Sequence, residues 1–164
     1  MEEFEYSLED DSDLAKRRME RHMDMSSKYI GLRGAKGVAE DDVYLSKWKK
    51  GLIKHSTKAK EHADLALSEA ERLFKEGKIG SSELKHAQYM HHWSHFFFNT
   101  DRAYMETPHS EKQLAYNKKA SLHRQKAEHL LHQILDEDPK SIVAQHHRLK
   151  GWHDKVYELS KLRR

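Results

Sequence analysis

Apolar residues recur at steps of three and four along most of this 164-residue chain, and little interrupts the pattern. This spacing places apolar side chains on one face of an α-helix, whereas a half-buried strand alternates with a period of two. Only two prolines and seven glycines are available as breakers, too few for the turns of many short strands. The sequence therefore predicts an all-α fold, a bundle of four to five mostly antiparallel helices.

The periodicity predicts a first helix over about 12–27 and a long second helix over about 40–75. A third is expected over 81–105, a fourth from Ser110 to just before Asp138, and a fifth from Pro139 onward. The 110–113 segment has the pattern of a capping box, and an aspartate before a proline is a good helix start. Gly77 is placed to end the long helix.

The segment 81–105 has apolar residues on two sides of the predicted helix. Phe98 falls on one side, and Trp93 and Phe96 fall on the other. A helix that is apolar on both sides belongs in the middle of a bundle. We therefore expect this helix to be central and the Phe98 side chain to be buried.

Charge is distributed unevenly along the chain. The first 13 residues hold seven acidic and no basic residues, whereas the remainder holds 30 basic and 20 acidic residues, a net charge of +10. We therefore expect a flexible acidic arm over 1–11 and a single helical domain over 12–164. Three of the seven glycines lie within 31–37, so a glycine-rich hinge or loop is expected over 31–39.

The chain has no cysteine, which excludes disulfides, thiolate metal sites and thiol chemistry within it. No unbroken apolar stretch exceeds three residues, whereas a membrane helix needs about 20, so we expect no membrane insertion. The acidic N-terminus is unlike a signal peptide. These features favour a reducing intracellular compartment, and we expect the protein to be cytoplasmic.

Fourteen histidines are the main candidates for chemistry, and several border the apolar stripes of the predicted helices. His91 and His95 are four residues apart, so both imidazoles lie on one helix face, where two ligands of one metal ion can sit. His62 and His123 also point inward if the stripes are read correctly. We predict no resident cofactor, with a divalent metal on these four histidines as the alternative. Structural histidines at the margins of the bundle are the simpler interpretation.

Basic residues near aromatic residues or glycines could contact phosphate groups, because such contacts need only Lys and Arg on one face. The candidate nucleic-acid or anion contacts are Arg33, Lys36, Lys47, Lys49, Lys50, Arg163 and Arg164. Acidic residues are interleaved with basic ones along the predicted helices, which is typical of a solvated surface. Nucleic acid is therefore kept as an alternative partner.

No nucleotide-binding loop and no Gly-x-Ser-x-Gly motif can be read from the sequence, so an enzyme is disfavoured. The leading hypothesis is a noncatalytic helical protein that interacts with or assembles with another protein or with its own copies. One alternative is a helical protein that binds nucleic acid through a basic surface. The other is a bundle that binds metal through histidines and carboxylates.

Overall fold

The computed structural model describes residues 2–34 and 42–137, and it describes side chains within 13–31 and 51–137. Over these residues the chain forms four helices and no strand, which confirms the predicted all-α bundle. The helices are α1 (Glu2–Gly34), α2 (Asp42–Lys75), α3 (Ser81–Met105) and α4 (Glu111–Glu137). The predicted fifth helix lies outside the described residues.

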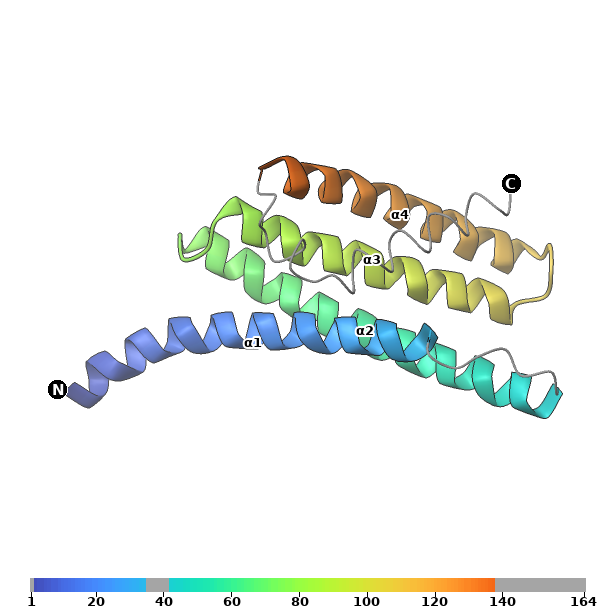
Figure 1. Ribbon diagram of the computed structural model, residues 1–164, viewed down its shortest axis with the longest axis horizontal. Helices are drawn as coiled ribbons and strands as arrows, with labels where there is room; N and C mark the ends of the chain where they lie inside the picture. The colour runs from blue at the N-terminus through green and yellow to red at the C-terminus, as the bar shows by residue number, and fades with distance from the viewer. Residues whose placement is uncertain (1, 35–41, 138–164) are drawn as a thin grey trace.

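Each helix runs antiparallel to the one before it (Figure 1). Helix α1 packs on α2, α2 packs on α3, and α3 packs on α4, with a smaller contact between α1 and α3. Helix α3 therefore lies between α2 and α4, so side chains on its opposite sides meet different neighbours. This central position is the one predicted from its two apolar sides.

Small residues bring α2 close to its neighbours. Ala59, Ala63, Ala66 and Ala70 recur at three- and four-residue steps along α2, and all four are fully buried. A stripe of alanines lets neighbouring helices approach because each contributes only a methyl group at the contact. Two core clusters result, one around Trp93 and the other, nearer the start of α1, around Met19.

The aromatic core of α3 differs from the predicted one, because Phe97 is buried whereas Phe96 and Phe98 are only partly buried. Trp93 and Phe97 are 1% and 2% exposed, and their rings meet edge to face with centroids 5.1 Å apart. Phe98, which we expected to be buried, is only partly buried, and the Lys60 ammonium lies 4.4 Å from its ring centroid. Neighbouring residues point about 100° apart on a helix, so the face toward the core holds Phe97 and turns Phe98 toward the edge.

The ends of α2 and α4 follow the predicted local chemistry. After α2, Gly77 has a φ of +71°, the Lys78 N–H donates to the Leu73 carbonyl and the Gly77 N–H donates to the Phe74 carbonyl. This is the Schellman arrangement, in which glycine accommodates the left-handed residue. At the start of α4, the Ser110 hydroxyl accepts a hydrogen bond from the Gln113 N–H at 3.2 Å.

Helix α1 is longer than the predicted 12–27, because it begins at Glu2 and ends at Gly34. The backbone of residues 2–11, for which we expected a flexible arm, is helical and extends beyond the other helices (Figure 1). No proline or glycine lies between Glu2 and Ile30, and acidic residues near a helix N-terminus interact favourably with the helix dipole. The expected hinge over 31–39 begins inside α1, and its residues 35–39 lie outside the described part.

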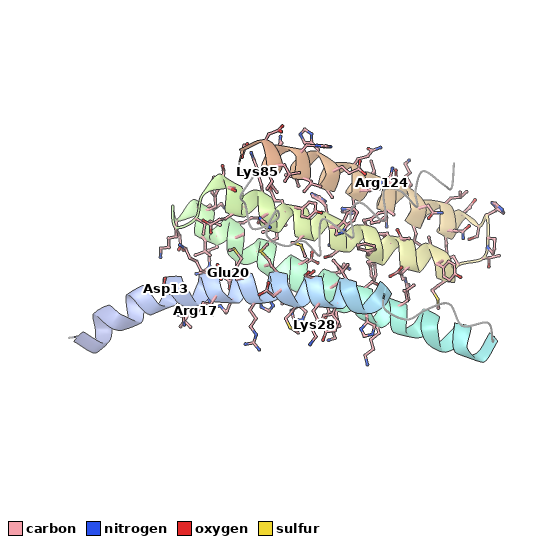
Figure 2. All side chains as sticks on the ribbon, in the orientation of Figure 1. Asp13, Arg17, Glu20, Lys28, Lys85 and Arg124 are labelled. Carbon is pink, nitrogen blue, oxygen red and sulfur yellow. The ribbon has the colours of Figure 1, made fainter. Side chains whose placement is uncertain are left out.

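Charged side chains are frequent on the outer surface of the described bundle, and large apolar side chains such as Leu65 and Leu114 are exposed there as well. Exposed charged side chains such as Arg17 and Lys28 project from α1 (Figure 2). Lys85, near the start of α3, forms an ion pair with Glu137 at the end of α4, which ties the two antiparallel helices together. Within residues 2–34 and 42–137, no helix is long and apolar enough to span a membrane.

Candidate metal centre

Four histidines and one aspartate gather where α2, α3 and α4 lie side by side. Helix α2 contributes Asp64, helix α3 contributes His91, His92 and His95, and helix α4 contributes His123. On α3, residues 91 and 95 are one turn apart and share the side that faces α2. Residue 92 points about 100° away from residue 91, toward α4.

The Asp64 carboxylate joins the two histidines that face α2. Its Oδ1 atom lies 2.7 Å from His91 Nδ1 and 2.8 Å from His95 Nε2, so one oxygen accepts two imidazole N–H bonds. The side chains of His91 and His95 are 22% and 17% exposed, whereas that of Asp64 is 41% exposed. The group is thus half-sheltered and remains open to solvent on the carboxylate side.

The second part of the cluster connects α3 to α4. His92 Nδ1 lies 3.0 Å from His123 Nδ1, so one of these nitrogens donates a proton and the other accepts it. The His123 ring also lies close to the first group, with its centroid 4.9 Å from that of His95. The two parts therefore form one continuous cluster.

Burial and the positive charges of neighbouring groups keep the imidazoles of His92 and His123 neutral. Burial, followed by the charges of neighbouring histidines and Lys126, lowers the pKa of His92 to about 4. Burial and the charges of His95 and His91 likewise lower the pKa of His123 to about 4. A neutral imidazole has a nitrogen lone pair, which is the form that binds metal ions.

Asp64 is held in its charged form. Burial acts to raise the pKa of this carboxyl, but hydrogen bonds from His91 and His95, together with their charges, outweigh burial. The pKa of Asp64 consequently lies well below its usual range. At pH 7 the cluster thus presents the Asp64 carboxylate and the neutral imidazoles of His92 and His123, donor types that divalent transition metals prefer.

Two overlapping sets of three residues place one ligand atom each within 4.8 Å of one another. One set is Asp64, His91 and His95, and the other is His91, His92 and His123. Zinc binds imidazole nitrogen and carboxylate oxygen at about 2.0–2.2 Å. An ion between Asp64, His91 and His95 would displace the two protons that now bridge them.

The structure brings together three of the four predicted metal ligands, His91, His95 and His123. The fourth, His62, lies apart from them. Its Nδ1 lies 2.8 Å from Nδ1 of His22 on α1, and the Tyr29 ring stacks on it. Residues two apart on a helix point to nearly opposite sides, so His62 faces α1 while Asp64 faces α3.

The predicted phosphate contacts are not described at the level of side chains. The backbone of Arg33 lies in α1, and the backbones of Lys47, Lys49 and Lys50 lie in α2. Three other candidates, Lys36, Arg163 and Arg164, lie outside the described residues altogether. The role of these residues stays a prediction.

Sequence reasoning missed Asp64 and His92. Asp64 precedes His91 by 27 residues, so no local spacing links them, although it directly follows Ala63 of the buried α2 stripe. The available signal for Asp64 was its position as a carboxylate next to the buried stripe of α2. His92 adjoins a predicted ligand, but only the position of α4 shows which partner it meets.

Comparison with known proteins adds no functional information. No protein-family model matches the chain, and neither a curated protein nor a solved structure gives a match.

Proposed function

We propose that this protein binds a divalent transition metal ion, with zinc as the reference ion, through Asp64, His91 and His95. The observation that carries the proposal is the convergence of two imidazole nitrogens on one carboxylate oxygen, at 2.7 and 2.8 Å. Two helices supply these groups, so the packing of α2 on α3 orients the ligands before any ion binds. His123 is the nearest imidazole on α4, with its ring centroid 4.9 Å from that of His95.

The ionisation state of the cluster supports the same proposal. Metal ligands must be deprotonated, so a carboxylate that stays charged and an imidazole that stays neutral at pH 7 reduce the competition from protons that an ion meets. The low pKa of Asp64 supplies a carboxylate, and the low pKa of His123 supplies a neutral imidazole. A carboxylate with two imidazoles suits zinc and other divalent first-row transition metals, so these donors indicate the class of metal and not one particular ion.

A titration of the metal-free protein with Zn²⁺, followed by calorimetry at pH 7, tests the proposal. We expect one ion per chain for the native sequence. Replacing His91 or His95 with alanine should weaken binding by about 100-fold or more, since even the partners behind metal ligands contribute about 10–100-fold. The matched control is His132→Ala, which removes an exposed histidine of α4 outside the cluster.

Loss of binding through misfolding must be distinguished from loss of a ligand. The variant His95→Gln keeps an N–H donor for Asp64 while removing the imidazole, and circular dichroism reports whether its helices remain. If the native chain binds Zn²⁺ no more tightly than folded His91→Ala, the proposal is wrong. The interaction or assembly role predicted from the sequence stays a prediction.

A further inference from the structure

A pocket of about 370 Å³ lies directly beside the cluster. Three helices form its walls, which include Leu67 and Glu71 from α2, His91 and His92 from α3, and Lys126 and Leu130 from α4. Its volume falls within the range of about 300–1,000 Å³ that is common for small-molecule sites. The pocket shares His91 with the proposed metal site, so the two adjoin along this side chain.

Three protein ligands leave zinc with a coordination position for water or for a bound molecule. Zinc sites that act on ligands keep such a position, whereas purely structural sites fill all four with protein groups. Because His91 belongs both to the metal site and to the pocket wall, the pocket adjoins the metal site along this side chain.

The charges of the pocket favour an anion. Lys126 lies in the wall, close enough to His92 and His123 that its charge lowers the pKa of both. A bound divalent ion would add two positive charges on the same side. Glu71 also lines the pocket, and both Glu71 and Lys126 are exposed, so water screens both charges and the ion would supply most of the attraction for an anion.

The pocket also has an apolar part. Leu67 and Leu130 are both partly buried and lie on α2 and α4, on either side of the α3 histidines. An inorganic anion would make little use of this surface, whereas a hydrocarbon group would remove it from water. A ligand that suits the whole pocket therefore combines an anionic oxygen with a short apolar body.

We infer that this pocket binds a small organic carboxylate, with its oxygen on the metal ion and near Lys126 and its apolar body between Leu67 and Leu130. This inference rests on the metal site proposed above. Its chemistry is reversible ligation: the carboxylate oxygen replaces a water molecule on the ion, and no covalent bond within the ligand is broken.

The experiment uses the full chain loaded with Co²⁺, whose visible absorption bands respond to changes in the ligands of the ion. Benzoate, acetate and inorganic phosphate are the probes. We expect benzoate to change the spectrum and to bind more tightly than acetate because of its apolar body. Lys126→Gln should weaken benzoate binding about tenfold and leave Co²⁺ affinity unchanged. Lys118→Gln, which removes an exposed lysine of α4 outside the pocket, is the charge-matched control.

A second variant tests the pocket itself. Leu130→Trp fills the space, so it should abolish the response to benzoate while Co²⁺ still binds. If Co²⁺ does not bind the native chain, the proposed metal site is wrong. If Co²⁺ binds but benzoate leaves the spectrum unchanged, only the present inference is overturned. If phosphate binds as well as benzoate and Leu130→Trp has no effect on either, the assignment of an organic carboxylate to this pocket is wrong.

Discussion

Acidification should destabilise the metal-free protein through the His92–His123 pair. Both imidazoles have a pKa lowered from 6.5 to about 4 in the folded chain, so the unfolded chain binds protons more readily. The stability they contribute is complete above about pH 6.5 and is lost as the pH falls toward about 4. Protonation also costs their shared hydrogen bond, because neither Nδ1 can then accept.

The size of the effect at pH 5 follows from the pKa shifts. A shift of one pKa unit corresponds to about 1.4 kcal/mol. Because pH 5 lies about 1.5 units below the unfolded pKa of about 6.5, each imidazole would contribute a loss of about 2 kcal/mol. The two rings titrate as a coupled pair and are partly exposed, so solvent screening reduces the sum. We expect the free energy of unfolding to fall by about 2 kcal/mol between pH 7 and pH 5.

Urea unfolding at pH 7 and pH 5, with a chelator present, measures this loss. The double variant His92→Gln/His123→Gln should lose most of the pH dependence. Some should remain, because burial and the neighbouring His22 also lower the pKa of His62. Asp64 does not contribute in this interval, since the stability from a carboxyl with a lowered pKa is lost only below about pH 4. If the free energy of unfolding falls equally in the native chain and in the double variant, His92 and His123 are not the cause of the pH dependence.

Four further changes test the fold and the site. Phe97→Ala should cost about 3–5 kcal/mol of unfolding free energy because the ring is fully buried, and Phe98→Ala should cost less, as measured by urea unfolding. Gly77→Ala should cost about 1–2 kcal/mol in the same assay, because its φ of +71° is unfavourable for any residue with a Cβ atom. Saturating Zn²⁺ at 100 times its dissociation constant should stabilise the native chain by about 2.7 kcal/mol, seen as a higher melting temperature that His95→Ala abolishes.

The helices were predictable from the sequence because their signals are local. The alanine stripe of α2, the glycine after it and the capping serine before α4 all act within a few residues of their own position. The full length of α1 was not predictable from the sequence. The acidic residues that favour a helix N-terminus also give this segment the composition of a solvated arm. Phe97 and Phe98 show a second limit of prediction from sequence. Neighbouring side chains point about 100° apart on a helix, so a small error in the predicted rotation of α3 decides which ring enters the core.

The candidate site depends on relations that no local pattern contains. The i, i+4 spacing of His91 and His95 predicts that they share a face, but the facing partner depends on how α2 and α3 align. A shift of α2 by one turn, about 5.4 Å, would place another residue opposite the two imidazoles and move Asp64 out of reach. His62 was equally plausible from its stripe, and it faces α1 instead.

The geometry of the cluster also favours ligand binding over a purely structural role. The Asp64 side chain is 41% exposed, and exposed ion pairs contribute only about 0–1 kcal/mol, so stability alone gives weak reason to gather these groups. At pH 7 the imidazoles of His92 and His123 are neutral, because burial and the charges of neighbouring histidines lower their pKa to about 4. A divalent ion requires neutral imidazoles and a carboxylate close together, and the cluster provides both. Zinc affinity that rises as the pH increases from 5 to 7 would show that the ion and protons compete for the same nitrogens.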